Sequence, residues 1–425
     1  MLKGKLYTQA VAGKVRVYFM QQGMPGEDPN APVKIFRKQA DDISFSFGMA
    51  GDAMGNWVEY IDNMKLTDPG VTCIFEGKLP YSYTFCEYLD EGAEIGHCYV
   101  YWVVSQGEDG TVLGPVGCRV RDPEVWWSHK RTVEELEKLT AEYPGLIEMK
   151  QYGETTMHRP MHALHIGNRD KVVALAGAVH ASEPGPELLV RAVRHIIHMR
   201  PDLLEKVGLA MLPTINIDVR EETVNGTPHY LRKNHNGVDL NRNFPWNWKE
   251  EFVYGVSNII PESSTYHGPY AGSENESQAA MKFIDAVVPA ALFVYDSASV
   301  ITEDTLLFDG DPSDGPSYDY ANVVANIYSQ AFRANHPGCG TFTAAPVSFP
   351  PELDCFAETG KPTATFEGWA YYKYFCPSFS LQSSNSVEGR CNNDDQVPLE
   401  RLEQWSLRHA YALIAVMEFL AEQKG

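Results

Sequence analysis

The sequence predicts an α/β protein in two domains: an all-β sandwich-like domain over residues 1–125 and an α/β domain over residues 126–425. Three observations lead to this prediction. A chain of 425 residues exceeds what one ordinary hydrophobic core organises. The first part consists of short aromatic and β-branched runs, whereas helical periodicity alternates with wholly apolar runs in the second. Hydrophobic content of 44%, without low-complexity tracts, indicates a fully folded chain.

The first domain is predicted from runs such as "KVRVYFM", "VTCIFEG", "YSYTFCEYL" and "HCYVYWVVS", which Gly, Pro, Asp and Asn separate. This pattern is typical of antiparallel strands that pack as a sandwich. The region carries no recognisable catalytic constellation. Structural packing is the simplest interpretation of it, and glycan binding, oligomerisation or covering a neighbouring site stay open.

The second domain begins near Trp126. Short apolar runs predict buried strands at residues 171–179, 209–217, 290–295 and 363–366, the last reading "TATF". Apolar residues at helical spacing predict a helix in "TVEELEKLTAEYP", residues 132–144, and a long final helix in residues 398–421. Strands that alternate with helices favour a sheet covered on both faces.

Charge and cysteine usage narrow the range of partners. The chain has 35 basic and 56 acidic residues, a net charge of −21, which disfavours nucleic acid or an anionic membrane as a partner. No apolar run is long enough for a membrane span and no signal peptide is visible, so the sequence as given predicts a soluble cytoplasmic protein; an exported mature form stays open. The eight cysteines form no C-x-x-C pair, which argues against zinc-ribbon and thioredoxin-type sites and favours buried thiols, with disulfides in an exported form as the alternative. The sequence does not give the oligomeric state.

Polar side chains lie at or just after the end of each of the four predicted strands. They are His180 and Glu183, Asn216 and Asp218, Asp296 and Ser297, and Glu367. Because the carboxyl ends of strands line the ligand crevice of an open α/β sheet, these residues predict one convergent site.

A second cluster lies in "YLRKNHNGVDLNRNFPWNW", residues 230–248, where Asn241 and Arg242 are adjacent and Arg232 lies upstream. A forked guanidinium beside an amide suits bidentate capture of a carboxylate. Taken singly, each residue also has a structural explanation, because His180 could sit in a turn, Glu367 in an ion pair and Arg242 against a buried carboxylate.

Together these residues resemble the M14 zinc carboxypeptidases. The resemblance covers residues 126–425 and rests on "TVEELEKLTAEYP", "YGETTMHRPMHALHIG", "HASE", "GVDLNRNFP", "YHGPYAGSENESQA" and "TATFEG", in the family's order and intervals. It implies a mixed-sheet, carboxypeptidase-like α/β domain. It also implies a metallopeptidase that holds one zinc ion per chain and acts on a peptide with a free C-terminal carboxylate.

The resemblance further implies a role for each matching residue. His180 and Glu183 match two zinc ligands, Arg232 the group that polarises the scissile carbonyl, Asn241 and Arg242 the clamp on the terminal carboxylate, and Glu367 the general base and acid. These roles agree with the chemistry, since a metal-bound water needs a carboxylate to accept its proton and the oxyanion needs a fixed positive group.

The first departure from the family concerns the third zinc ligand. The family has a histidine at a strand end, where this sequence has Asp296 in "LFVYDSAS", and no histidine lies between His267 and His336. Asp296 could ligate through oxygen, giving one imidazole and two carboxylates. Because this set cancels the metal's charge, we expect slower chemistry, weaker zinc retention or another, harder divalent metal.

The second departure is the family's substrate-closing tyrosine, which is missing from residues 340–367. Phe342 or Phe349 could supply packing there but no hydroxyl. Glu352 and Asp354 could favour a cationic terminal residue such as Lys, Arg or diaminopimelate, or could belong to a solvated acidic loop.

The sequence therefore predicts a metallocarboxypeptidase-like hydrolase that removes a C-terminal residue, with a cell-wall type peptide as one candidate substrate. Two alternatives stay open. One is a non-catalytic protein that binds peptides or carboxylates and has a degraded zinc site. The other is an N-acyl amino-acid deacylase, against which the leading helix and hairpin argue.

Overall fold

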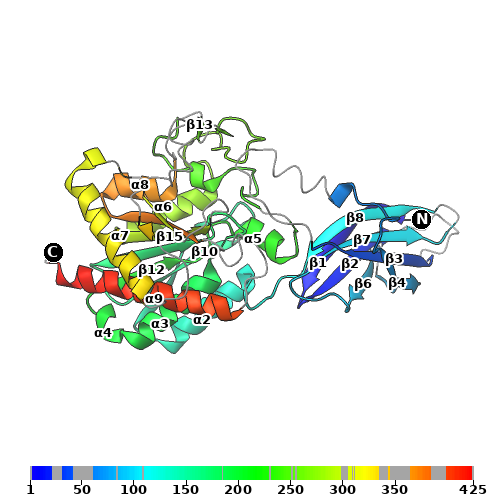
Figure 1. The fold of residues 1–425 in the computed structure, drawn as a ribbon, viewed down its shortest axis with the longest axis horizontal. Coiled ribbons are helices and arrows are strands. Elements are labelled where there is room, and N and C mark those ends of the chain that lie inside the picture. Colours follow the sequence, from blue (N-terminus) through cyan, green and yellow to red (C-terminus); the bar gives the residue numbers. More distant parts are fainter. Residues whose placement is uncertain are drawn as a thin grey trace. The chain divides into compact units, whose positions relative to one another are not determined.

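The computed structural model describes residues 2–21, 31–41, 61–82, 85–107, 110–183, 185–228, 231–249, 252–253, 256–297, 305–308, 310, 312–334, 343–344, 364–383 and 399–423. The chain divides into two compact units, whose elements are labelled in Figure 1. Unit 1 comprises Met1–Phe45, Asp52–Trp126 and Glu222–Tyr230, and unit 2 comprises Ser46–Gly51, Trp127–Glu221 and Leu231–Gly425.

Unit 1 contains two antiparallel sheets of four strands each. The first has the order β1 (Leu2–Val11), β2 (Lys14–Gln21), β6 (Phe85–Asp90), β5 (Tyr81–Ser82); the second has the order β4 (Thr72–Gly77), β3 (Val33–Gln39), β7 (Cys98–Ser105), β8 (Val112–Arg119). Alternate residues of β2 and β7, among them Val15, Val17, Tyr99 and Tyr101, are buried in one core. The prediction of an all-β, sandwich-like N-terminal region is confirmed.

One segment of unit 1 comes from the second half of the chain. The segment Glu222–Tyr230 belongs to unit 1, where the backbone N–H of Ala10 donates to the Asn225 carbonyl at 2.7 Å. The N–H of Arg119 donates to the Gly226 carbonyl at 2.8 Å. Gly226 has a φ of +107°, which residues with a Cβ rarely adopt.

Unit 2 is built on an eight-stranded mixed sheet with the order β17-β16-β18-β15-β11-β12-β10-β9. The strands are β9 (Ile147–Glu154), β10 (Pro160–Ile166), β11 (Val172–Gly177), β12 (Gly208–Leu212), β15 (Ala291–Ser297), β16 (Thr305–Leu307), β17 (Thr343–Ala344) and β18 (Ser378–Ser383). β12, β11, β15 and β18 run parallel, and β10 and β16 pair antiparallel to them. The predicted mixed-sheet α/β fold is confirmed.

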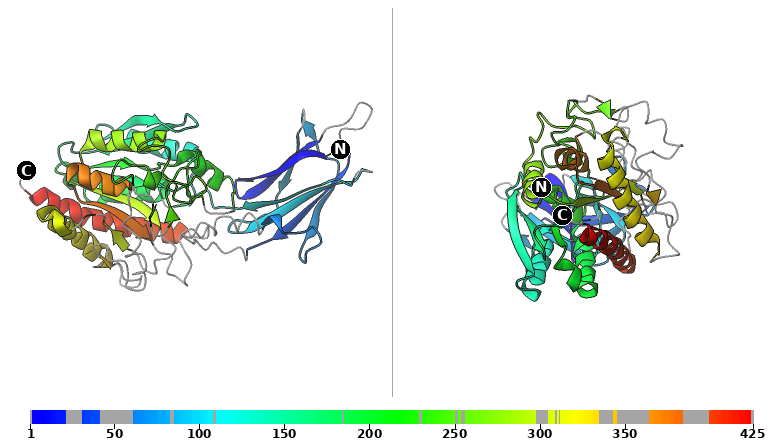
Figure 2. Two further views of the ribbon diagram at one scale, coloured as in Figure 1. Left: turned by 90° about the horizontal axis from the view of Figure 1, so that it is seen from above. Right: turned by 90° about the vertical axis from the view of Figure 1, so that its left-hand side faces the viewer.

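Helices cover both faces of this sheet (Figure 2). The helices of the described residues are α2 (His129–Glu142), α3 (Pro186–Met199), α4 (Pro201–Leu204), α5 (Ile217–Val224), α6 (Asn275–Val287), α7 (Pro316–Ala334), α8 (Phe366–Tyr374) and α9 (Leu399–Glu422). There are also 3-10 turns η1 (Leu240–Arg242) and η2 (Pro312–Asp314) and a small hairpin of β13 (Phe252–Val253) and β14 (Val256–Ser257). Phe283 of α6 and Trp369 of α8 pack against Ala174 and Val294 of the sheet. α3 contacts α2 and α9, and α9 also contacts α7. The helices predicted at residues 132–144 and 398–421 are confirmed as α2 and α9.

Two of the predicted strands are wrong in extent or type. The run 209–217 is not one strand, because β12 ends at Leu212 and α5 begins at Ile217. The described part of the "TATF" run, residues 364–366, is not a strand either, because α8 begins at Phe366. The hydroxyl of Thr365 accepts a hydrogen bond from the Gly368 N–H at 3.1 Å and caps α8, so Glu367 stands in the first turn of a helix.

The described cysteines are Cys73, which is exposed, and Cys86, Cys98, Cys118 and Cys376, which are buried; all five are free thiols. Burial raises the pKa of Cys376 to about 11, which keeps that thiol protonated and unreactive. Among the described helices, none is both long and apolar enough to cross a membrane.

Candidate metal centre

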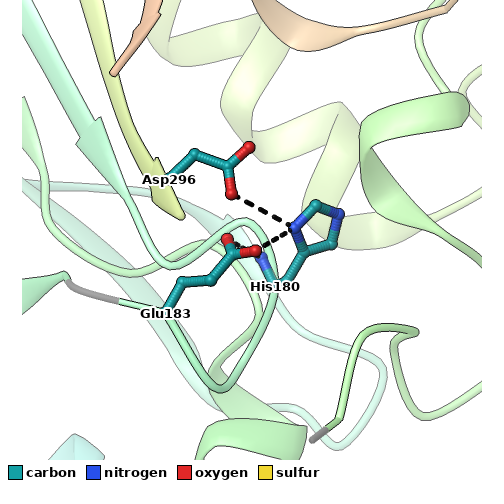
Figure 3. A group of neighbouring side chains, drawn as sticks. All are labelled: His180, Glu183 and Asp296. Carbon is teal, nitrogen blue, oxygen red and sulfur yellow. Dashed lines mark hydrogen bonds and ion pairs between the residues drawn. The ribbon is translucent and has the colours of Figure 1, made fainter. Parts of the chain in front are cut away.

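His180, Glu183 and Asp296 converge in unit 2 (Figure 3). His180 and Glu183 lie in the turn that follows β11, and Asp296 lies near the end of β15, the parallel neighbour of β11. His180 Nδ1 lies 2.6 Å from Glu183 Oε1 and 3.6 Å from Asp296 Oδ1. One donor atom from each residue falls within 4.8 Å of the others, and all three side chains are buried. We call these residues the triad.

Two glycines allow the turn of the triad to fold tightly. A Cβ on Gly177 would lie 2.8 Å from the Gly185 Cα, and a Cβ on Gly185 would lie 2.8 Å from the Ala178 Cβ. Side chains at either position would therefore push apart the two ends of the turn. The close approach keeps His180 and Glu183 at the end of β11, where Asp296 can reach them.

Asp239 holds the second nitrogen of His180. Its Oδ1 lies 3.1 Å from His180 Nε2 and also accepts the Asn241 N–H at 3.0 Å. Its Oδ2 accepts from Arg232 Nε at 2.8 Å and Arg232 Nη2 at 2.7 Å. Burial alone would raise the pKa of Asp239, but Arg232, His180 and Arg242 hold it well below its usual value. An ionised Asp239 thus links the triad to the arginine predicted to polarise the carbonyl.

The electrostatics of the triad favour a cation. Burial and the neighbouring Asp296 carboxylate raise the pKa of Glu183 to about 8. Burial and Arg232 lower the pKa of His180, but Glu183, Asp239 and Asp296 outweigh them and raise it well above its usual value. Both pKa shifts have the same cause: the negative charge of the buried carboxylates is not balanced by nearby positive charge. Protons on His180 and Glu183 supply that balance when no cation is bound.

The donor set fits one zinc ion. At metal–ligand distances of about 2.0–2.2 Å, two donors on a tetrahedral zinc ion lie about 3.4 Å apart. The separations of 2.6 and 3.6 Å around His180 Nδ1 bracket this value. The bond from Asp239 to His180 Nε2 also has the form that orients a ligating imidazole. One nitrogen and two oxygens can equally hold other divalent metals.

Asn241 and Arg242 are distant from the triad in the sequence, but Asp239 links the Asn241 backbone to His180. Both are buried in η1, which Asp239 caps by accepting the Asn241 N–H. The Asn241 side-chain carbonyl accepts the Phe366 N–H at 2.9 Å, which fixes the first turn of α8 beside the Asn–Arg pair. Glu367, the next residue, is buried in that turn and is not a member of the triad.

A family model described as zinc carboxypeptidase matches residues 132–389. The chain belongs to the zinc carboxypeptidase family. The match begins in α2 and ends just after β18, so it contains every site residue described above.

Curated relatives share part of this region. Carboxypeptidase B of Bos taurus is 32% identical over 166 residues, 35% of this chain and 39% of that protein. Carboxypeptidase A2 of Rattus norvegicus is 27% identical over 177 residues, 38% of this chain and 42% of its own length. Murein peptide amidase A of Escherichia coli K12 is 42% identical over 78 residues, 17% of this chain and 32% of that protein. The aligned regions thus span less than half of these relatives.

Solved structures show the same fold. Bovine thrombin-activatable fibrinolysis inhibitor, in complex with tick carboxypeptidase inhibitor, matches 70% of this chain and 98% of its own with a TM-score of 0.58 at 19% identity. A metallo-carboxypeptidase from Burkholderia cenocepacia matches 97% of this chain and 88% of its own with a TM-score of 0.50 at 13% identity.

Within the zinc carboxypeptidase fold, β18 is the parallel neighbour of β15, and Gln382 stands opposite Asp296 in the register. The hydroxyl of Ser380 in β18 donates to Asp296 Oδ2 at 3.4 Å. The prediction that Glu367 ends a strand of this sheet is wrong, because Glu367 lies in the first turn of α8 and β18 is the strand beside β15. If Glu367 takes part in the site, it does so from the first turn of α8 and not from a strand of the sheet.

Other residues named in the sequence analysis have partners outside the triad or lie outside the described residues. His267 stacks on Trp248 with ring centroids 4.1 Å apart and is not in the triad. Asn216 donates to the Lys233 carbonyl at 3.2 Å, and Asp218 pairs with Arg159, so both have structural partners. Phe342, Phe349, Glu352 and Asp354 lie outside the described residues.

Asp239 contacts His180 and was missed in the sequence analysis. It stands in "GVDLNRNF", two residues before Asn241, but an isolated aspartate in a loop is an ordinary turn residue. Its position beside both His180 and Arg232 depends on the fold. The family resemblance was the one available signal.

Proposed function

We propose that this protein is a metallocarboxypeptidase-like hydrolase that removes the C-terminal residue of a peptide, with one zinc or another divalent ion held by His180, Glu183 and Asp296. The observation that carries the proposal is the geometry around His180. Its Nδ1 faces two buried carboxylates while its Nε2 is fixed by Asp239. Membership of the zinc carboxypeptidase family supports the same reading.

Zinc at the triad would supply an acidic water ligand and polarise the scissile carbonyl. Arg232, oriented by two bonds to Asp239, would stabilise the oxyanion. Arg242 and Asn241 would bind the terminal carboxylate of the substrate. Glu367 would carry protons to and from the reacting atoms. Its buried place in the first turn of α8, next to the bond between Phe366 and Asn241, supports this assignment.

We propose a cell-wall type peptide as the substrate class. The support is the 42% identity over 78 residues to murein peptide amidase A. We further propose that residues 126–425 form the catalytic domain, while residues 1–125 form an accessory domain. The antiparallel strands of residues 2–119 support the second assignment.

A second candidate is a non-catalytic protein that binds peptide carboxylates. The observation that favours it is the 2.6 Å contact between His180 and Glu183, because a proton can hold this pair together without a metal ion. Asp296, in place of an imidazole, also makes the site less suited to zinc. In this case the Asn241–Arg242 pair would bind the C-terminal carboxylate of a peptide, and the protein would catalyse no reaction.

Metal content separates the two candidates. We would measure it per chain by elemental mass spectrometry, on protein purified without chelators, for wild type, Asp296→Ala and a control, Asp285→Ala. Asp285 pairs with Lys373 outside the triad. Near-stoichiometric zinc that only Asp296→Ala loses supports the hydrolase, and a panel of peptides against acyl amino acids then separates carboxypeptidase from deacylase. Wild type that binds no metal even after zinc is supplied refutes the hydrolase.

A further inference from the structure

We propose that Arg220 is a positioning residue of the metal centre, which fixes the turn that carries His180 and Glu183. This inference rests on the proposed function, because it assumes that the triad binds a metal ion. Arg220 lies on α5, outside the motifs of the sequence analysis, and only 1% of its surface is exposed. A buried guanidinium must be matched by acceptors, and those acceptors identify its task.

The acceptors of Arg220 lie on the turn and on the helix that follows it. Nη1 donates to the carbonyl of Ala181 at 2.9 Å and to the carbonyl of Glu183 at 2.7 Å. Nη2 donates to Glu187 Oε1 at 2.6 Å. Glu187 is buried in the first turn of α3. One planar group therefore ties the main chain of the turn both to α5 and to α3.

The turn needs this support because its own hydrogen bond is weak. The Glu183 N–H reaches the His180 carbonyl at 3.3 Å, beyond the usual range for a peptide hydrogen bond. The Ala181 and Glu183 carbonyls are buried with their residues, so each requires a donor. Arg220 supplies one to both, through charge-assisted bonds that are stronger than neutral ones.

A second anchor explains why the position of the turn matters for the site. Ser182 Oγ accepts the Leu231 N–H at 3.0 Å. Leu231 precedes Arg232, which Asp239 links to His180. With Arg220 holding the carbonyls on either side of Ser182, the turn is fixed at three successive residues. A shift of the turn would move both ligands away from Asp296.

Partners behind the metal ligands commonly change metal affinity by about 10–100-fold when they are removed. We therefore expect Arg220→Met to lower zinc affinity by about 10–100-fold. Arg220→Lys should recover part of this loss, because an ammonium group can still donate to the two carbonyls. Glu187→Gln should have a smaller effect than Arg220→Met, since the Nη1 bonds to the turn remain.

The experiment measures zinc affinity by competition with a chelator, together with the thermal unfolding of the metal-free full-length chain. Arg408→Met is the matched control. Arg408 is also 1% exposed, but it lies on α9 with its guanidinium 4.0 Å from the Phe332 ring centroid. We expect Arg408→Met to lower the unfolding temperature and to leave zinc affinity unchanged.

Zinc affinity that falls in Arg220→Met but not in Arg408→Met, at similar losses of stability, supports the positioning role. Folded Arg220→Met with wild-type zinc affinity overturns it and leaves Arg220 a purely structural residue. If Arg220→Met does not fold, Arg220→Gln, which stays polar but loses the charge of the bonds to the turn, decides by the same criterion: reduced affinity supports the role and unchanged affinity refutes it. Wild type that binds no zinc at all overturns the proposed function itself, a different result from unchanged affinity in the variants.

Discussion

Asp239→Asn tests the link between the triad and Arg232. The amide keeps the size of the carboxylate but removes its charge. Asp239 makes four contacts of 2.7–3.1 Å, two to Arg232 and one each to His180 and the Asn241 backbone. Because the side chain is fully buried, solvent cannot replace the charge that is lost.

Two magnitudes follow from this geometry. Removing one partner of a buried ion pair costs about 3–5 kcal/mol, which corresponds to a fall of about 10 °C in unfolding temperature for a domain of this size. His180 would also lose the acceptor that orients its ring toward the metal. We expect zinc affinity to fall by about 10–100-fold for that reason.

The assay combines thermal unfolding of metal-free protein with zinc affinity by chelator competition. Asp90→Asn in unit 1 is a closely matched control. Asp90 is buried and accepts from Arg37 at 2.8 Å, from the Tyr101 hydroxyl at 2.9 Å and from the Gly92 N–H at 3.1 Å. It therefore resembles Asp239 in its arginine, side-chain and backbone donors but does not contact the triad.

Asp90→Asn should destabilise unit 1 without changing zinc affinity, whereas Asp239→Asn should reduce both stability and affinity. Equal zinc affinity in wild type and Asp239→Asn would refute the reasoning. In that case His180 would hold its orientation through the turn alone, and Asp239 would serve only to neutralise Arg232.

Three further predictions concern Asp296 of the triad, His409 and Gly226. Asp296→His should raise the preference for zinc over manganese, measured by metal competition, because imidazole suits zinc better than carboxylate does; unchanged preference would show that Asp296 is not a ligand. His409 is held near Tyr328, and burial together with Arg408 lowers its pKa to about 3. In the unfolded chain His409 is therefore protonated between pH 7 and pH 5, whereas in the folded chain it stays neutral, so the free energy of unfolding falls by about 2 kcal/mol over this range. His409→Gln should reduce this dependence of unfolding free energy on pH, measured by denaturant titration at each pH. An unchanged dependence on pH contradicts the assignment. Gly226→Val should destabilise unit 1 by at least about 2 kcal/mol, since its φ is positive and a Cβ would lie 2.5 Å from Cys118 Sγ; an unchanged unfolding midpoint would mean that the segment can rearrange.

The fold class and the convergence of the triad could be predicted from sequence patterns. Period-two runs marked the strands of unit 1, and polar residues after apolar runs marked His180, Glu183 and Asp296. These residues meet because β11 and β15 are parallel neighbours, with Gly177 opposite Tyr295. The rule that strand ends line a ligand crevice selected these three residues, but it also selected Asn216, Asp218 and Glu367, which are not members of the triad.

The supporting residues could not be predicted in this way. Asp239 and Arg220 lie in a loop and on α5, and each acts through partners that are distant in the sequence. Glu222–Tyr230 belongs to unit 1 through backbone bonds such as that from Ala10 to Asn225, and backbone bonds leave no side-chain signal. Local patterns identify which faces are buried, but not which buried charges meet.

The misplaced strand bears most on mechanism. Both "TATF" and "SFSLQS" are short runs whose periodicity is ambiguous, and the Thr365 hydroxyl decides the first in favour of a helix. As a consequence, the backbone position opposite Asp296 belongs to Gln382, which has no carboxylate. A proton carrier in this site must then come from an element other than that strand position. We propose Glu367 for this role, and Asn241 binds the first turn of α8 in which it lies, so the residue proposed to clamp substrate also holds the turn of the residue proposed to move protons.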